Sequence, residues 1–311
     1  MSKTIEVDGQ EITLSNLDKL FYPDEAITKG DVIDYYHRIA PVMVPHMTER
    51  PLNMQRFPDG IEGYGFYQKE VPDYFPDWIS RVDVEVKEDN THQTQVVCDR
   101  AATLVYLADQ ACLTPHIWLS RSHHLHRPDR LVFDLDPPEG SDDFDPLRQA
   151  ARRLHELLAQ LGLPPYLMTT GSQGLHVVAP LEEQDSFDAV RDFCRDLADL
   201  LARRAPEELT TAPRKEKREG RLFLDYLRNA YGQTTVTPYA LRPLPGAPVA
   251  TPLDWDELDQ RDLNPQSYRL DNIFRRLGQK DDPWATMAEQ ARSLEEPQKQ
   301  LRQLMEEADA A

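Results

Sequence analysis

The sequence is poor in cysteine and in long apolar runs, and it carries no excess of positive charge. Its three cysteines, Cys98, Cys112 and Cys194, are odd in number and far apart, which fits neither a disulfide framework nor a Cys-x-x-Cys metal site. We interpret them as reduced thiols. No apolar stretch approaches the ~20 residues of a membrane-spanning helix, and the N-terminus lacks a secretory signal. These absences predict a cytoplasmic protein with no membrane partner.

The formal net charge of −19 at pH 7 argues against a uniformly basic nucleic-acid-binding surface. The charges are unevenly distributed, however. Five cations fall within the eight residues from Arg214 to Arg221, whereas acids gather at 142–145 and 306–309. A locally basic channel on an acidic protein is therefore compatible with the composition. The 311 residues, 40% of them hydrophobic, suffice for one large domain or two small ones.

Hydrophobic periodicity in the middle of the chain predicts alternating strands and helices. We expect strands at 131–136, 166–170, 175–181 and 222–226, and helices at 147–161 and 187–204. The order strand, helix, hairpin, helix, strand is typical of a split sheet of the ferredoxin or RNA-recognition type, with helices on one face. The sequence therefore predicts an α+β fold.

Shorter elements flank this region on both sides. A capping-box pattern at Thr28 to Asp31 predicts a helix start, and strands are expected at 82–86 and 94–97 before a helix near 101–111. From about Tyr268 the chain is expected to be a helical tail, with Pro283 at a helix start and Pro297 dividing it. Its apolar positions are interpreted as a packing stripe: Trp284, Met287, Ala291 and Leu294.

Two aspartates, Asp134 and Asp136, stand two residues apart where the first of these central strands ends. Side chains at this spacing share one sheet face, and neighbouring carboxylates repel unless a divalent cation compensates them. A third acid, Asp225, lies on the strand expected beside the first. Three such acids fit a two-metal phosphoryl-transfer centre. The alternative for an isolated Asp-x-Asp is a solvated pair at a turn.

Other polar residues surround these acids in the predicted sheet. The turn Gly171 to Gly174 offers backbone N–H groups and the Ser172 hydroxyl to an anion, and His176 follows it. Arg228 and Arg242 are suited to phosphate groups. The alternatives are a structural histidine and surface ion pairs. The histidine-rich segment 122–126 has no cysteine or further histidine nearby at zinc-ligand spacing and is interpreted as a polar loop.

Four segments carry a resemblance to a known family. They are NLDKLFYPDEAITKGDVIDYY at 16–36, LVFDLDPPEG at 131–140, TTGSQGLHVVAPL at 169–181 and RLFLDYLRNAYGQTTVTPYALRPLPGAPVATPLDWDEL at 221–258. In this order, they resemble the polymerase domain of bacterial ligase D, a branch of the archaeal–eukaryotic primase superfamily. The resemblance implies a primase-polymerase catalytic domain over 1–267, with an N-terminal β-rich part to about 130 and a catalytic part over 131–267, and a helical tail over 268–311 packed on it.

The resemblance also implies roles for individual residues. Asp134, Asp136 and Asp225 would bind two Mn²⁺ or Mg²⁺ ions, and the nucleotide would contact Ser172, His176, His116, Arg228 and Arg242. Lys19 and Lys29 would recognise a downstream 5′-phosphate, Phe66 and Tyr67 would stack on template bases, and a loop bearing Lys215, Lys217, Arg218 and Arg221 would hold DNA ends together. Gln55 and Gln173 replace lysines of the family, which is expected to weaken nucleotide affinity or to shift which nucleotide is used.

The implied activity is extension of a primer 3′-hydroxyl at DNA gaps or broken ends in non-homologous end joining, with ribonucleotides preferred over deoxynucleotides. The implied partners are 5′-phosphorylated DNA, nucleoside triphosphates, Ku and an ATP-dependent DNA ligase, the last two supplied by a longer chain or by separate proteins. Two alternatives remain open: a DNA-end-binding scaffold with weak synthesis, which the two glutamines and the net charge favour, and a two-metal phosphoesterase.

Overall fold

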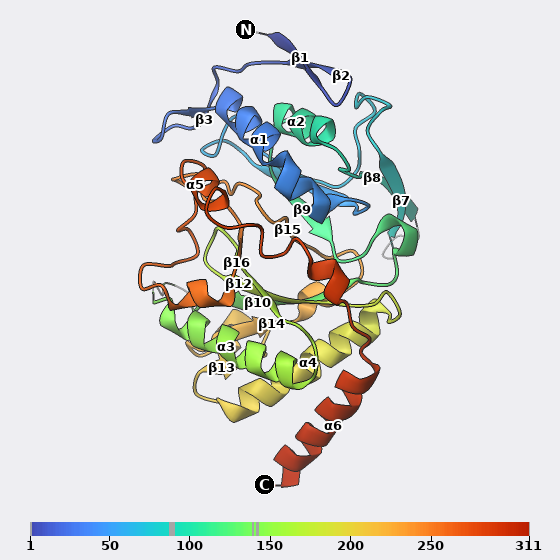
Figure 1. Cartoon of the computed structure of the whole chain (residues 1–311), viewed down its shortest axis with the longest axis vertical. Helices are drawn as coiled ribbons and strands as arrows, with labels where there is room; N and C mark the ends of the chain where they lie inside the picture. Colours follow the sequence, from blue (N-terminus) through green and yellow to red (C-terminus); the bar gives the residue numbers. More distant parts are fainter. Residues whose placement is uncertain (1, 87–90, 139, 141–142, 311) are drawn as a thin grey trace. The chain divides into compact units, whose positions relative to one another are not determined.

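The computed structural model describes residues 2–86, 91–138, 140 and 143–310. The chain divides into two compact units, each made of three segments (Figure 1). The first unit comprises residues 1–125, 234–251 and 268–282, and the second comprises 126–233, 252–267 and 283–311. The domain boundary after residue 267 that the family resemblance implies stays a prediction.

The first unit combines a four-stranded sheet, ordered β15-β9-β5-β6, with two helices that pack against each other. Its helices and strands are β1 (Lys3–Val7), β2 (Gln10–Leu14), β3 (Leu20–Tyr22), β4 (Ile27–Thr28), α1 (Lys29–Met47), β5 (Leu52–Arg56), β6 (Phe66–Gln68), β7 (Arg81–Val86), β8 (Thr91–Val96), α2 (Ala101–Asp109), β9 (Cys112–Trp118), β15 (Thr234–Val236) and α5 (Ile273–Leu277). Helix α1 begins at the predicted capping box, in which Thr28 and Asp31 satisfy each other's backbone N–H groups.

The second unit is built on a six-stranded sheet ordered β13-β14-β10-β12-β11-β16. Its helices and strands are β10 (Arg130–Asp136), α3 (Asp145–Gln160), β11 (Tyr166–Thr169), β12 (Leu175–Pro180), α4 (Phe187–Arg204), β13 (Leu209–Thr210), β14 (Leu222–Asp225), β16 (Thr251–Leu253) and α6 (Glu295–Ala310). In the view of Figure 1, α3 and α4 both lie below β10 and β12 of this sheet. Both helices contact β10, so the split α+β sheet is as the sequence predicts.

The apolar stripes of α3 and α4 explain this packing. In α3 the buried residues Leu147, Ala151, Leu154 and Leu158 recur at helical spacing, and α4 buries a similar row. Burying one such leucine contributes about 1.5–3 kcal/mol. The facing residues of β10, including Leu135, are fully buried, so the opposite face of that strand carries the polar side chains.

The C-terminal region differs from the sequence-based expectation. Pro283 lies in a turn and not at a helix start, and Pro297 lies in the first turn of α6 without dividing it. Proline is tolerated there because the first N–H groups of a helix have no partner inside the helix. The packing stripe is confirmed for Trp284, Met287 and Leu294, which are buried.

Among the described residues, no helix combines the length and the apolar character needed to cross a membrane.

Candidate active site

Three carboxylates meet on neighbouring strands of the second unit's sheet. The antiparallel register of β10 and β14 pairs Asp134 directly with Asp225, and Asp136 follows two residues along β10. Side chains alternate between the faces of a strand, so all three acids lie on the face opposite Leu135. The structure thus brings together the three acids that the sequence analysis grouped.

The environment of these acids disfavours three simultaneous negative charges. Burial raises the pKa of Asp136 to about 6, and the charges of Asp134 and Asp225 add to this effect, while Arg218 and Arg228 oppose it. Burial also raises the pKa of Asp225. A cluster of carboxylate oxygens whose mutual repulsion raises a pKa in this way is a donor set that suits a hard divalent cation. The three residues therefore fit the expected metal site.

Two basic side chains contact the acids directly. The Nε2 atom of His176 lies 3.4 Å from Oδ1 of Asp134, and β10–β12 pairing places the two residues opposite each other. The Nε atom of Arg228 lies 3.5 Å from Oδ2 of Asp134 and 3.7 Å from Oδ2 of Asp225. His176 is buried, whereas the Arg228 side chain is 43% exposed and is open to an incoming anion.

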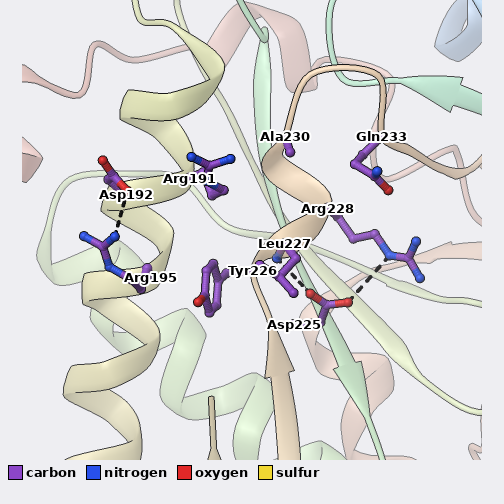
Figure 2. Close-up of a pocket in the computed structure, with 9 residues that line it drawn as sticks. All are labelled: Arg191, Asp192, Arg195, Asp225, Tyr226, Leu227, Arg228, Ala230 and Gln233. Carbon is purple, nitrogen blue, oxygen red and sulfur yellow. Dashed lines mark hydrogen bonds and ion pairs between the residues drawn. The ribbon is translucent and has the colours of Figure 1, made fainter. Parts of the chain in front are cut away.

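A buried asparagine fixes the segment that carries Arg228. The side chain of Asn229 accepts a hydrogen bond from the Val132 N–H at 2.9 Å and donates one to the Val132 carbonyl at 2.7 Å. Oδ1 of Asp225 accepts the Leu227 N–H at 2.8 Å, as Figure 2 shows. Sequence reasoning missed Asn229, because a single asparagine after a strand carries no pattern that distinguishes it.

The turn between β11 and β12 approaches the acids at Gly174. Gly174 approaches β10 so closely that a Cβ atom there would overlap the Leu135 carbonyl oxygen and lie 3.7 Å from Oδ1 of Asp134. The turn was expected to offer free backbone N–H groups, but those of Ser172 and Gly174 donate to Oγ1 of Thr170 at 3.3 and 3.2 Å. The expectation was wrong for these two N–H groups, because the Thr170 hydroxyl at the start of the turn already accepts from both.

A residue far along the chain supports this turn. The Gln266 side chain donates a hydrogen bond to the Ser172 carbonyl at 3.0 Å. Its own segment is held to α3 by Arg148, which donates to the carbonyls of Leu258, Gln260 and Leu263. Neither contact can be predicted from the sequence, because both form only when residues 252–267 rejoin the second unit.

The basic loop between β13 and β14 is ordered by its own arginines. Arg218 donates to the Ala212 and Pro213 carbonyls, and its guanidinium lies 4.0 Å from the centre of the Phe223 ring. Arg221 donates to the carbonyls of Lys217 and Arg218. Lys215 and Lys217 are exposed in a short 3-10 helix. Their expected role in holding DNA ends stays a prediction.

In the first unit, the two lysines expected at a 5′-phosphate differ in environment. The ammonium group of Lys29 is buried and donates to Asp109 at 2.7 Å, to the Ser15 carbonyl at 2.7 Å and to the Ser15 hydroxyl at 3.2 Å. Lys19 is 38% exposed and pairs with Asp59 at 2.5 Å. Of the two, Lys19 has the more accessible ammonium group.

The expected template-stacking residues lie on β6. Tyr67 is 56% exposed, and its ring meets that of His116 edge to face with 5.6 Å between the centres. Phe66 stacks on Tyr64, which is 81% exposed. Tyr64 is an aromatic residue that sequence reasoning missed, although its spacing from Phe66 was a usable signal.

The remaining predicted residues are placed individually. Arg242 lies at the edge of the first unit's core, where its carbonyl accepts the Tyr22 hydroxyl at 2.8 Å. Gln55, on β5, pairs with Tyr67 of β6, while Gln173 is exposed at the tip of its turn in the second unit. The consequences of the two glutamines stay predictions.

Comparison with known proteins identifies similar chains. Residues 28–284 match the family model described as LigD, primase-polymerase domain. The multifunctional non-homologous end joining DNA repair protein LigD of Mycobacterium tuberculosis is 35% identical over 281 residues, which cover 88% of this chain and 36% of that protein. The bifunctional non-homologous end joining protein LigD of Bacillus subtilis is 31% identical over 275 residues, covering 88% and 44%.

A solved structure shares the fold. It is the polymerase domain from Mycobacterium tuberculosis ligase D in complex with DNA, with a TM-score of 0.84 and 33% sequence identity, covering 91% of this chain and 99% of that one. The primase-polymerase fold predicted from the sequence is therefore confirmed. The present chain spans less than half the length of the two curated relatives above, 36% and 44% respectively.

Proposed function

Because the chain belongs to the LigD primase-polymerase domain family, whose members are nucleotidyltransferases, we propose that it extends a primer 3′-hydroxyl at gaps or broken DNA ends during non-homologous end joining. The observation that best supports this proposal is the strand register, which pairs Asp134 with Asp225 and leaves Asp136 on the same face. Fold alone would not support an activity, since split sheets of this kind serve many reactions.

The acids would hold two divalent cations, Mn²⁺ or Mg²⁺. When bound, these cations would lower the pKa of the primer hydroxyl and offset the charge that builds up on the transferring phosphoryl group. His176 and the Ser172 hydroxyl would orient the triphosphate of the incoming nucleotide. Arg228, whose guanidinium already lies beside two of the carboxylates, would exchange this contact for a phosphate oxygen.

The substrates follow from residues on both units. Lys19 would bind the downstream 5′-phosphate, and Tyr67 with Phe66 would stack on template bases, since every base offers a π-face. We propose ribonucleotides as the preferred substrates. We further propose that Ku and an ATP-dependent DNA ligase act with this chain at the same DNA ends.

The test is extension of a gapped duplex whose downstream strand carries a 5′-phosphate, with Mn²⁺ and either ribonucleotides or deoxynucleotides. Asp134→Ala should abolish extension, because it removes one ligand from the acid cluster. Asp309→Asn, an exposed change on α6, is the matched control and should retain full activity. Extension that survives Asp134→Ala would contradict the proposal. Binding that depends on the 5′-phosphate without any extension would favour the end-binding scaffold.

A further inference from the structure

A pocket of about 590 Å³ opens beside Asp225, between α4 and the segment that follows β14. Arg191 and Arg195 line it from α4, and Tyr226, Arg228 and Gln233 line it from the other side (Figure 2). Asp225 belongs to the same lining. The pocket therefore shares Asp225 with the acid cluster, and its Arg228 contacts Asp134 and Asp225 of that cluster.

The two arginines of α4 that line the pocket, Arg191 and Arg195, form ion pairs with acids of the same helix. Arg191 contacts Asp188 at 2.9 Å, and Arg195 contacts Asp192 at 2.8 Å and Asp196 at 3.0 Å. Both arginine side chains are more than a third exposed. Solvent-exposed ion pairs such as these are weak, and a phosphate that accepts two charge-assisted hydrogen bonds from a guanidinium competes with the carboxylates. The guanidinium groups are therefore available to an anionic ligand.

Tyr226 adds a third group suited to a nucleic acid. Figure 2 shows its ring between α4 and Asp225. Partial burial raises the pKa of its phenol, and Asp199 contributes to the shift, so the hydroxyl keeps its proton and can donate a hydrogen bond. A phenol beside two guanidinium groups is suited to a sugar-phosphate backbone.

The order of the strands indicates which strand of DNA the pocket serves. Ser172 and His176 lie on the β11–β12 side of Asp134, whereas the pocket adjoins β14 on the other side. In phosphoryl transfer, the attacking and leaving oxygens lie roughly in line across the phosphorus. If the triphosphate occupies the side of Ser172 and His176, the attacking 3′-hydroxyl must arrive from the side of Asp225.

We propose that the pocket formed by Arg191, Arg195 and Tyr226 binds backbone phosphates of the primer strand just upstream of its 3′ end. The inference rests on the proposed polymerase function, because it uses the direction of the nucleotide. It assigns to the outer face of α4 a function that the sequence did not suggest, since its arginines alternate with acids as on any solvated helix.

The test compares the double variant Arg191→Gln/Arg195→Gln with Arg203→Gln, a control that also removes an exposed ion pair from α4. In gap extension, we expect the double variant to raise the KM for the primer about tenfold or more, because it removes two charge-assisted contacts. The KM for the nucleotide and kcat at saturating primer should stay within about twofold of the unmodified protein. Arg203→Gln should change none of these values.

Primers with single neutral methylphosphonate linkages locate the contact. In the unmodified protein, one or two linkages near the 3′ end should weaken binding in fluorescence anisotropy, and the double variant should be insensitive to the same linkages. A primer KM within twofold of normal, or a rise confined to the nucleotide KM, would overturn the proposal. If the unmodified protein binds primer but extends nothing, the polymerase function fails, and the anisotropy comparison still decides whether the pocket holds the strand.

Discussion

At the scale of single residues, the acid cluster is defined by its unfavourable electrostatics. The folded-state pKa of Asp136, about 6, lies above its ordinary value of 3.8. The folded state binds the Asp136 proton more tightly than the unfolded state does. The stability that this difference contributes is fully present below about pH 3.8 and is lost as the pH rises through about 6. At neutral pH the carboxylates of Asp134, Asp136 and Asp225 therefore repel one another in the metal-free protein, and a divalent cation would relieve this repulsion.

The affinity for Mn²⁺ should consequently depend on pH. Protons and the cation compete for Asp136, so we expect the apparent affinity to fall by up to about tenfold per pH unit below about pH 6 and to be nearly constant above about pH 7. Titration calorimetry across this range measures the effect. A constant affinity down to about pH 5 would contradict it.

The same repulsion predicts the effect of an amide. Asp136→Asn should abolish extension and yet raise the free energy of unfolding of the metal-free protein at about pH 7.5 by about 1 kcal/mol, because it removes one of three like charges. Denaturant unfolding with and without a chelator measures both states. A destabilised metal-free variant would show that Asp136 supports the fold through contacts other than its charge.

The two lysines should separate stability from binding. Lys29→Ala leaves Asp109 buried without its ammonium partner and should cost about 3–5 kcal/mol of stability. Lys19→Ala should leave stability within about 0.5 kcal/mol and reduce the preference for a 5′-phosphorylated downstream strand. Thermal unfolding and competition between phosphorylated and unphosphorylated gaps distinguish them. Equal destabilisation by both changes would contradict the contrast in burial.

At the scale of elements, α3 holds the segment that supports the Ser172 turn. Arg148→Ala removes three hydrogen bonds to backbone carbonyls and should cost about 1–3 kcal/mol of stability. It should also raise the nucleotide KM, because Gln266 would lose its fixed position beneath the turn. Arg152→Ala, on the same helix with a single exposed ion pair, is the control and should change stability by less than about 0.5 kcal/mol.

The elements themselves were largely predictable. Alternation of apolar residues predicted β10, β12 and β14, and the helical stripe predicted α4 with both of its ends, because burial on one face leaves a periodic signature. The tail was predicted less well, because prolines there were interpreted as boundaries without knowledge of which N–H groups needed partners.

The site was predictable only where a pattern carries it. The Asp-x-Asp spacing fixes a common face, and the alternating strand expected beside it supplied Asp225. Asn229 and Gln266 were not predictable, because their function depends on hydrogen bonds to carbonyls and N–H groups distant in the sequence. The Arg191 pocket was missed for a similar reason, since its residues share no periodicity with the strand that they adjoin.

At the scale of the whole molecule, the charge of −19 limits how DNA can bind. Only local groups of cations can neutralise phosphates, so the logarithm of the DNA-binding constant should fall with the logarithm of salt concentration with a slope of only about −2 to −4. Anisotropy between about 50 and 300 mM KCl measures the slope. A slope steeper than about −6 would indicate a far more extended basic surface.

The pairing of Asp134 with Asp225 has one more consequence. Strand β14 is four residues long, and its outer neighbour β13 pairs with only two of its residues. A slip by one residue would turn the Asp225 side chain to the helix-covered face, where it could no longer share a ligand with β10. A cation would therefore bind only the alignment in which Asp225 pairs with Asp134. Metal binding would thus stabilise the native strand register over shifted registers during folding. Divalent cations should speed the approach to a single native alignment.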